Sequence, residues 1–339
     1  MQNKDLDLHA LFQALAEMTH LHGTSAVPMT GGKNNRLFRM ETEEGVSLVI
    51  KQYYPDDRKR LMHEYEVLTA LAQRGFTDIP RPIARFDAWQ VGVFSFVEGE
   101  NIPTKELTPK HMEQIAAHLA RLHAFTMEEV AEPLPMGSMS VRSYADAITH
   151  IRKRMVPFSG DAIRTLHPHL QAFLHEVPVA SIVESRLEIF LKKHSPEDVT
   201  RRTPDNGLCL SSVDIGPHNM LWRADGSLVV LDWEYAGWDH PMHSIAGFLA
   251  HDRTQRMGHK NIDAFMDAYL RCTPLDQSVL EVLDPYLELY RLNWLAIYLT
   301  TLLPSRLERW AFAEGSLFDQ EAVVQRQMDR VRVLLTQIT

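Results

Sequence analysis

Two aspartates and an asparagine lie around a predicted β-hairpin in the second half of the chain. Asp214 precedes Asn219 in one short loop, and Asp232 directly follows the apolar run 228–231. The sequence RADG at 223–226 is typical of a tight turn between two strands. We therefore expect a loop that carries Asp and Asn, then a hairpin whose second strand ends in another Asp.

These residue types meet the needs of phosphoryl transfer from a nucleotide. One carboxylate must orient or accept the proton of the attacking hydroxyl, and an amide oxygen with a second carboxylate can hold the Mg²⁺ that bridges the phosphates. Asp214 fits the first role, and Asn219 and Asp232 fit the second. Because this spacing also occurs by chance and Asp is common before turns, the interpretation depends on the upstream chain.

The first third of the chain contains a glycine turn and a lysine on predicted antiparallel strands. Gly31 and Gly32 interrupt the first predicted strand, and Lys51 lies near the end of the third. A glycine turn lets backbone N–H groups approach phosphates, and the lysine can reach them as a point charge. Both features also occur as ordinary turns and exposed strand ends, and Asn34 could contact a nucleotide or satisfy turn backbone.

A helix is predicted over 56–74, capped by one of its two leading aspartates and ended by a glycine. Glu64 flanks its buried apolar face, so we expect it to pair with Lys51. Glu66 points elsewhere on the helix and is expected in solvent. Because a lysine at a strand end should contribute little to packing, Lys51→Ala is expected to stop turnover and leave the fold intact.

The composition becomes mainly helical after Gly99, which indicates two lobes. We expect an N-terminal nucleotide-binding lobe over 1–98, with a helix at 5–21 followed by a five-stranded antiparallel sheet and one helix. The lobe 99–339 should be mainly helical and carry the catalytic loop and the acceptor site. In a two-lobe nucleotide enzyme the connecting strand offers backbone partners to the adenine edge. The candidates for this contact are Phe94, Ser95 and Val97.

Helical periodicity predicts the elements of the second lobe. The expected helices are 108–125, 139–157, 160–175, 178–195, 241–252, 260–271, 275–302 and 318–337. One of them, 275–302, carries acidic residues together with Tyr286, Tyr290 and Trp294. Such a face would suit a cationic or sugar ligand, but acidic and aromatic residues on a long helix more often form a surface stripe beside a core stripe.

Composition is that of an ordinary globular protein. The chain has 339 residues, of which 45% are apolar and 23% charged. A net charge of −9 argues against nucleic acid or an anionic membrane as partner. Two cysteines, no apolar run of membrane-spanning length and no signal-peptide core predict a cytoplasmic protein without disulfides. A monomer and a homodimer both remain open.

Taken together in chain order, the motifs described above resemble those of the aminoglycoside phosphotransferase and choline kinase family. The fold of this family is similar to that of protein kinases. The resemblance covers nearly the whole chain and rests on GGKNNRLFR, LVIKQY, HEYEVLTAL, FSFVEGE, SVDIGPHN and LDWEYAGWDHP. It implies an α+β two-lobe protein-kinase-like fold, ATP and Mg²⁺ as cofactors, and a small-molecule hydroxyl acceptor such as a sugar, amino alcohol or aminoglycoside. Asp214 then corresponds to the catalytic residue, Asn219 and Asp232 to the metal ligands, and Lys51 with Glu64 to the phosphate-orienting ion pair.

The chain departs from the family pattern in its loop. Ser212 stands where the family usually has His, and an Asp common in the following helix is missing, so Asp239 is considered as a substitute support for the loop. His218 could approach substrate or be buried. A catalytically silent kinase-like binding protein is therefore the alternative function. A protein kinase is disfavoured because no Ala-Pro-Glu segment follows Asp232.

Overall fold

The computed structural model describes residues 6–30, 34–130, 133–273, 275 and 277–338. The chain divides into two compact units. The sheet unit comprises Met1–Asn101, Asn219–Tyr235 and Glu308–Phe318, and the helical unit comprises Ile102–His218, Ala236–Leu307 and Asp319–Thr339. Two short segments from the second half of the sequence thus belong to the same unit as the N-terminal strands. Among the described residues, no helix combines the length and the apolar character that a membrane span requires.

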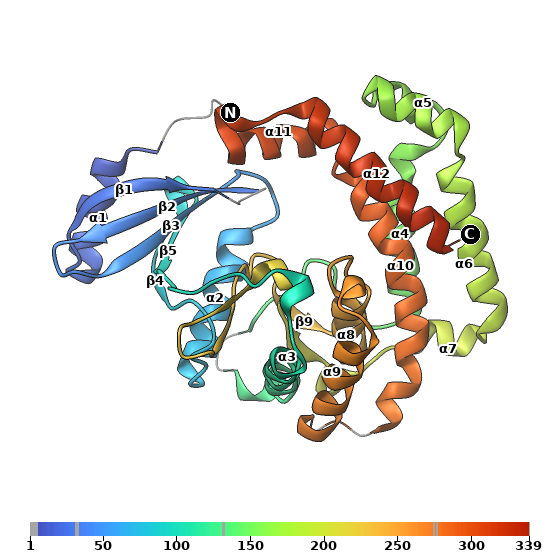
Figure 1. Ribbon diagram of the computed structural model, residues 1–339, viewed down its shortest axis with the longest axis horizontal. Coiled ribbons are helices and arrows are strands. Elements are labelled where there is room, and N and C mark those ends of the chain that lie inside the picture. Colours follow the sequence, from blue (N-terminus) through green and yellow to red (C-terminus); the bar gives the residue numbers. More distant parts are fainter. Residues whose placement is uncertain (1–5, 31–33, 131–132, 274, 276, 339) are drawn as a thin grey trace. The chain divides into compact units, whose positions relative to one another are not determined.

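The sheet unit is built on the predicted five-stranded antiparallel sheet, which is confirmed. Its strands follow the order β1-β2-β3-β5-β4 (Figure 1). They are β1 Gly23–Met29, β2 Asn35–Thr42, β3 Ser47–Tyr53, β4 Pro82–Phe86 and β5 Val91–Ser95. In the register of β2 and β3, Lys51 lies opposite Leu37, and in that of β3 and β5 it lies opposite Gly92. Lys51 therefore sits on a central strand of the sheet, paired on both sides.

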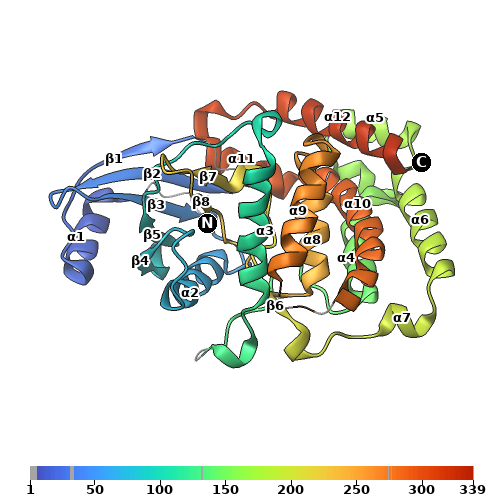
Figure 2. The same ribbon diagram turned by 60° about the horizontal axis from the view of Figure 1, so that its bottom comes forward.

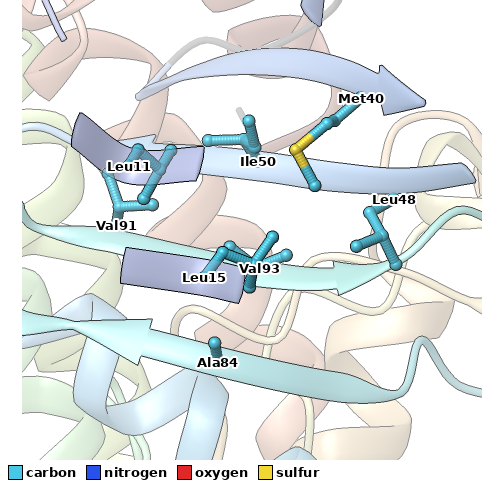
Figure 3. Packing of buried hydrophobic residues seen from close by; sticks show 8 residues of the cluster. All are labelled: Leu11, Leu15, Met40, Leu48, Ile50, Ala84, Val91 and Val93. Carbon is cyan, nitrogen blue, oxygen red and sulfur yellow. The ribbon is translucent and has the colours of Figure 1, made fainter. Parts of the chain in front are cut away.

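The first helix, α1 Leu8–Thr19, covers one face of this sheet. Leu11 and Leu15 pack into a core with Met40, Ile50 and Val93 (Figure 3). Each of these side chains is removed from water, and full burial of one such residue contributes about 1.5–3 kcal/mol to stability. The helix is shorter than the predicted 5–21, of which the first residue lies outside the described part of the chain.

The second helix, α2 Arg60–Gln73, begins later than predicted, and the expected aspartate cap is wrong. Its N-cap residue is Lys59, which has φ 52 and makes no side-chain capping bond. Asp56 instead lies 2.9 Å from the guanidinium of Arg60 and 2.7 Å from that of Arg309. The aspartate is used for ion pairing because two arginines are buried beside it.

The predicted hairpin in the second half of the chain is present in the sheet unit. It consists of β7 Met220–Trp222 and β8 Leu228–Val230, closed by a turn in which Gly226 has φ +79. Its first strand bridges to Glu100, and the Val230 N–H donates to the Asp78 carbonyl. The hairpin is thereby tied to the N-terminal part of the sheet unit.

Sequence periodicity missed α11 Pro304–Glu314, most of which belongs to the sheet unit. Its Phe312 carbonyl accepts a hydrogen bond from the Arg36 Nε, and the Phe312 ring meets Tyr54 edge-on at 5.4 Å. The predicted helices leave residues 304–314 uncovered. Here, residues late in the sequence complete the packing around β2 and the start of α2.

The helical unit is formed mainly of helices with one short two-stranded sheet. The strands are β6 Cys209–Ser211 and β9 Gly237–Asp239. The helices are α3 Pro109–His123, α4 Tyr144–Met155, α5 Pro168–Glu176, α6 Val179–Lys193, α7 Pro196–Thr200, α8 Pro241–Leu249, α9 His259–Cys272, α10 Leu283–Thr300 and α12 Gln320–Ile338. Helix α3 runs beside α9, and α10 packs against α4, α8 and α12 (Figures 1 and 2).

The aromatic residues of the predicted helix 275–302 lie mainly in the core. The regular helix is α10, preceded by a 3₁₀ segment at Gln277–Val282. Tyr286 and Tyr290 are buried and pack against the imidazole of His243. On the outer side, Glu288 lies 3.2 Å from the Lys193 ammonium. The stripe is therefore explained by packing on one side and a surface ion pair on the other.

Acid sensitivity is expected from His123, which is buried where α3 meets α9. Its Nδ1 lies 2.7 Å from the Tyr269 hydroxyl, and burial, with His240 and His118 nearby, lowers its pKa to about 3. Because the pKa is depressed, the unfolded chain binds this proton first as pH falls below 6.5, the ordinary value. The free energy of unfolding should then fall by about 1.4 kcal/mol per pH unit, until the native histidine titrates near its own pKa.

The check is urea unfolding of the wild type and His123→Gln at several pH values between about 4 and about 7. Glutamine retains a polar partner for Tyr269 but takes up no proton. Unfolding of the variant should therefore take up as much as one proton fewer, and its free energy of unfolding should depend less steeply on pH. His175→Gln, at an exposed position of α5, serves as the control and should keep the wild-type slope. Equal slopes for His123→Gln and wild type would contradict the assignment.

Candidate active site

The hairpin in the sheet unit brings Asn219 and Asp232 together. Asn219 directly precedes β7, and its carbonyl accepts a 2.7 Å hydrogen bond from the N–H of Leu231, which directly follows β8. Asp232 is the next residue, with φ 62 in the left-handed region that non-glycine residues seldom adopt. Such a conformation costs of the order of 1 kcal/mol and persists where neighbouring contacts impose it, often at functional sites.

Lys51 is held by carboxylates from two separate elements of the sheet unit. Its ammonium lies 2.6 Å from Glu64 Oε2 on α2 and 2.7 Å from Asp232 Oδ1. Glu64 is the partner predicted from the helical phase. The competing residue, Glu66, lies 3.2 Å from the Arg85 guanidinium. Lys51 and Glu64 are both buried, with 7% and 3% of their surface exposed.

Glu64 organises the surrounding groups through both of its oxygens. Oε2 also accepts a 2.6 Å hydrogen bond from the Tyr53 hydroxyl, and Oε1 accepts from the Trp233 N–H at 3.2 Å. The hydrogen bond from the Trp233 N–H attaches the backbone directly after Asp232 to helix α2. Burial alone would lower the pKa of Lys51, but the carboxylates of Asp232 and Glu64 outweigh it and raise the pKa well above the usual value. Lys51 is therefore a permanent cation at this site.

Glu234 is a member of the site that sequence reasoning missed. Its side chain is fully buried, and its Oε1 accepts a 2.7 Å hydrogen bond from the Asn34 amide. The amide of Asn35 donates to Oε2, and the Arg60 Nε lies 4.0 Å from the same oxygen. Asn34 is thus used to hold the segment after Asp232. The available signal was an acidic residue two positions after Asp232, with a pair of asparagines on the glycine turn.

The remaining nucleotide-binding candidates lie in and after β5 or outside the described residues. Gly31 and Gly32 lie outside the part of the chain that the structure describes. Phe94 is buried within β5, opposite Val49. The Ser95 hydroxyl accepts a 2.9 Å hydrogen bond from the Arg81 N–H, and Val97 follows the end of the strand. Their role toward a nucleotide stays a prediction.

Burial of Lys51 changes the expected result of Lys51→Ala, which had been predicted to leave the fold intact. Removing the ammonium would leave Glu64 as a buried carboxylate without its cation, whereas Glu234 would keep the Arg60 guanidinium 4.0 Å away. Breaking one partner out of a buried ion pair costs about 3–5 kcal/mol. We therefore expect Lys51→Ala to lose stability of this order, as measured by urea unfolding at neutral pH.

The matched control removes an arginine from an ion pair at the surface. Arg152 and Glu184 form a pair whose side chains are 45% and 44% exposed, and such pairs contribute below about 1 kcal/mol. Arg152→Ala should therefore change stability much less than Lys51→Ala. If the two variants lose the same stability, the buried Glu64 carboxylate does not depend on Lys51 in the way described.

In the helical unit, Asp214 follows the end of β6 on a tightly bent backbone. Val213 has φ 65, an outlier for a β-branched residue. Its N–H donates a 3.0 Å hydrogen bond to the Ser211 hydroxyl, which lies 3.1 Å from the Ser244 hydroxyl of α8. The Ser212 hydroxyl, at the position where the family pattern has His, is buried without a hydrogen-bond partner in the described chain. Ser211 and α8 therefore support the loop.

Asp239, considered as a support for that loop, makes its hydrogen bonds elsewhere in the described residues. Its Oδ1 accepts from the N–H groups of Val141 and His240 at 2.9 and 2.8 Å. Its Oδ2 lies 2.7 Å from the Nδ1 of His243 on α8. The carboxylate thus joins β9 to the start of α4 and to α8, so the expectation that it supports the Asp214 loop directly is wrong.

Two histidines flank Asp214 within the helical unit. The Nε2 of His218 lies 3.8 Å from Asp214 Oδ2, and its ring stacks on that of His251 with centroids 5.1 Å apart. Burial, together with the neighbouring His218, lowers the pKa of His251 to about 4, so this imidazole is neutral at neutral pH. The expected burial of His218 is partly met, because its side chain is 26% exposed while its Nδ1 is buried. Its approach to substrate stays a prediction. Sequence analysis did not single out His251.

Comparison with solved structures shows which fold these elements form. An amicoumacin kinase in complex with AMP-PNP and Ca²⁺ matches with a TM-score of 0.65 and 13% identity over 98% of this chain and 93% of that one. A spectinomycin phosphotransferase in complex with ADP and spectinomycin matches with a TM-score of 0.62 and 17% identity, over 96% and 98% of the two chains. A choline kinase from Streptococcus pneumoniae gives 0.59 and 14%, over 96% and 99%. At these identities the likeness concerns the fold, and it confirms the predicted α+β protein-kinase-like class.

Sequence comparison gives the family. A search of curated proteins found no significant match. The sequence model of the phosphotransferase enzyme family matches residues 25–286, a range that contains Lys51, Glu64, Asp214, Asn219 and Asp232. Because this match covers well over half of the chain, the protein belongs to the phosphotransferase enzyme family.

Proposed function

We propose that this phosphotransferase is an ATP-dependent kinase that transfers the γ-phosphoryl group of ATP to a hydroxyl of a small molecule. The observation that carries the proposal is the buried contact of Lys51 with both Glu64 and Asp232. An isolated cation at this depth would be costly, and a structural ion pair needs one carboxylate rather than two. The second carboxylate, that of Asp232, lies on a backbone with positive φ. Its presence beside Lys51 is explained if it binds another cation.

The oxygen donors near Lys51 fit a magnesium ion. Mg²⁺ prefers oxygen ligands and is usually held by one or two carboxylates together with phosphate oxygens. Asp232 offers a carboxylate that is one-third exposed, and Asn219 offers a buried amide at the same open end of the hairpin. When bound, the ion neutralises charge on the phosphates. Once Asp232 faces such an ion, the Lys51 ammonium, still oriented by Glu64, can contact phosphate oxygens.

Asp214 is proposed as the residue that receives the acceptor proton. In the transfer, the acceptor oxygen forms a bond to the γ-phosphorus, and the bond from that phosphorus to the β,γ-bridging oxygen breaks. The acceptor proton passes to the Asp214 carboxylate, and ADP leaves with the bonding electron pair. General-base and positioning effects of such a residue contribute about 10²–10⁴-fold to the rate.

For the nucleotide, we propose that the turn at Gly31 and Gly32 covers the phosphates and that backbone groups of the segment Phe94–Val97 meet the adenine edge. Ser95 is the last residue of β5, and Val97 lies two residues beyond it. Asn34 is assigned a positioning role, because its amide already binds Glu234. These assignments follow the predicted lobe organisation, with the boundary near residue 98.

The acceptor is proposed to be a small hydroxyl compound such as a sugar, an amino alcohol or an aminoglycoside-like molecule. Structures of similar fold include a phosphotransferase in complex with spectinomycin and a protein named choline kinase, and both of these compounds belong to the proposed classes. We place the reaction in the cytoplasm, where ATP is available and where the free Cys209 and Cys272 would stay reduced. The proposed reaction requires no particular oligomeric state, so a monomer and a homodimer are both compatible with it.

One observation favours the alternative of a catalytically silent binding protein. The hydroxyl of Ser212, where the family pattern has His, is buried without a hydrogen-bond partner among the described residues. A loop with weaker internal support could bind a nucleotide without turning it over. Both functions predict nucleotide binding, so turnover must separate them.

The test is a screen of hydroxyl acceptors with ATP and Mg²⁺, read out as ADP release. The screen should cover sugars, amino alcohols and aminoglycosides, with Asp214→Asn as the inactive control. We expect at least one acceptor class to raise ADP release in the wild type and not in the variant. Nucleotide binding without acceptor-stimulated turnover by any class would favour the silent alternative.

A further inference from the structure

A second group of residues that could hold a metal ion lies around the Asp214 loop, in addition to the proposed magnesium ligands Asn219 and Asp232. Asp214, His218 and His251 each offer one ligand atom, and these three atoms lie within 4.8 Å of one another. The cluster combines two imidazoles with one carboxylate and lies wholly within the helical unit. Its composition differs from that of the proposed magnesium site, which offers oxygen ligands only.

The backbone at Gly216 lets the two imidazoles approach the loop. A Cβ atom at this position would lie 2.6 Å from the His218 Nδ1 and 2.7 Å from the His251 Nε2, closer than side-chain atoms allow. Both nitrogens therefore converge on the space that a larger residue would fill. The His218 Nδ1 is buried and makes no hydrogen bond within the described residues.

Neighbouring residues fix the orientation of the His251 imidazole. Its Nδ1 lies 3.3 Å from the Asp252 carboxylate, and the Trp294 ring meets its imidazole edge-on at 4.9 Å. The Arg253 N–H donates a 3.1 Å hydrogen bond to the same Nδ1, so in the neutral ring the proton lies on Nε2. For Nε2 to act as a metal ligand, that proton must move to Nδ1, where the Asp252 carboxylate can accept it, as is typical of metal-binding histidines. His251 is only 4% exposed, so its ring has little freedom to turn away.

We propose that Asp214, His218 and His251 bind a divalent transition-metal ion such as Zn²⁺, and that the bound ion inhibits phosphoryl transfer. Imidazole ligands suit Zn²⁺, whereas Mg²⁺ requires oxygen ligands in near-octahedral geometry. Three protein ligands also leave a fourth position open, as in many zinc sites. The inhibition rests on the proposed function of Asp214, because an ion on its carboxylate occupies the lone pair that would receive the acceptor proton. The binding itself does not rest on that function.

The binding arm of the test uses Co²⁺, whose visible absorption reports four-coordinate nitrogen and oxygen ligation. Co²⁺ is titrated into the whole protein without nucleotide, and Zn²⁺ is then added to displace it. Loss of groups that merely orient a ligand costs about 10–100-fold in metal affinity, so loss of a ligand should cost at least as much. We expect this loss in His251→Gln and in His218→Gln. His218 is partly exposed, so its variant should fold if the buried His251→Gln does not.

Two controls locate the ion. Asp232→Asn, which removes a ligand of the proposed magnesium site, should bind Co²⁺ as the wild type does. The exposed His175→Gln should do the same. Excess Mg²⁺ should leave the cobalt absorption unchanged. Absorption that disappears in Asp232→Asn, or that persists unchanged in both His218→Gln and His251→Gln, would overturn the proposed site.

The inhibition arm measures ADP release from MgATP with increasing Zn²⁺, followed by a zinc-selective chelator. We expect inhibition of the wild type that the chelator reverses, at the same Zn²⁺ concentrations that displace Co²⁺. His218→Gln should require at least about 10-fold more Zn²⁺ for half inhibition of whatever activity it retains. Displacement of Co²⁺ by Zn²⁺ without inhibition would overturn the inhibitory role and would count against Asp214 as the base, while the metal site would stand.

Discussion

Asp214→Asn is expected to lower the turnover number by about 10²–10⁴-fold and to leave the affinity for MgATP unchanged. The carboxylate is proposed to act on the acceptor hydroxyl, so its loss affects the transition state rather than nucleotide binding. Asparagine has nearly the same shape and preserves the loop between Ser211 and His218. The measurement is steady-state ADP release with the acceptor that the screen identifies, at saturating MgATP.

A control for the Asp214 variant is Asp205→Asn, in the segment before β6. Asp205 is exposed and pairs with Arg142, so its loss should leave turnover at the wild-type level. A turnover number for Asp214→Asn equal to that of Asp205→Asn would show that Asp214 is not the base. A raised Michaelis constant for MgATP with an unchanged turnover number would instead place Asp214 at the nucleotide.

Asp232→Asn is expected to abolish most MgATP affinity together with turnover. An asparagine oxygen can still coordinate, but the negative charge that holds the cation is lost, and kcat/KM should fall by at least about 10²–10³-fold. The fold should survive, because Lys51 keeps Glu64 at 2.6 Å as its partner. The measurements are kcat/KM for MgATP and a thermal melt in the absence of nucleotide.

The control for this variant lies in the turn of the same hairpin. Asp225 is exposed, and its carboxylate accepts a 2.8 Å hydrogen bond from the Ser227 N–H. Asp225→Asn changes the same formal charge at the opposite end of the hairpin and should keep both affinity and turnover. If Asp225→Asn and Asp232→Asn behave alike, the effect arises from net charge or hairpin stability and not from a metal ligand.

Much of the fold could be predicted because its elements have strong local patterns. The hairpin around Gly226 and the antiparallel strands of the small sheet follow from alternating apolar residues and turn chemistry. β9 and α7 were missed because they are short, at Gly237–Asp239 and Pro196–Thr200, and their local signal is weak. α11 was missed although it is longer, since its packing against Arg36 and Tyr54 depends on residues far away in the sequence.

The contact between Lys51 and Glu64 was predictable because the helical phase determined it. The phase of α2 distinguished Glu64 from Glu66, and the structure places Glu64 beside Lys51. The burial of Lys51 could not be read from its strand, because it results from Glu64 and Glu234 meeting it in three dimensions. His251 was missed for the same reason, since only the tertiary fold brings α8 and the following turn to the Asp214 loop.

The most direct test of the account is calorimetric titration of MgATP into Asp214→Asn and Asp232→Asn, with their turnover numbers measured beside it. We predict that Asp214→Asn binds MgATP like the wild type but turns over slowly, and that Asp232→Asn loses both binding and turnover. The reverse pattern, with affinity lost in Asp214→Asn and kept in Asp232→Asn, would show that the two roles are exchanged. Normal binding and turnover in both variants would contradict the proposed site as a whole.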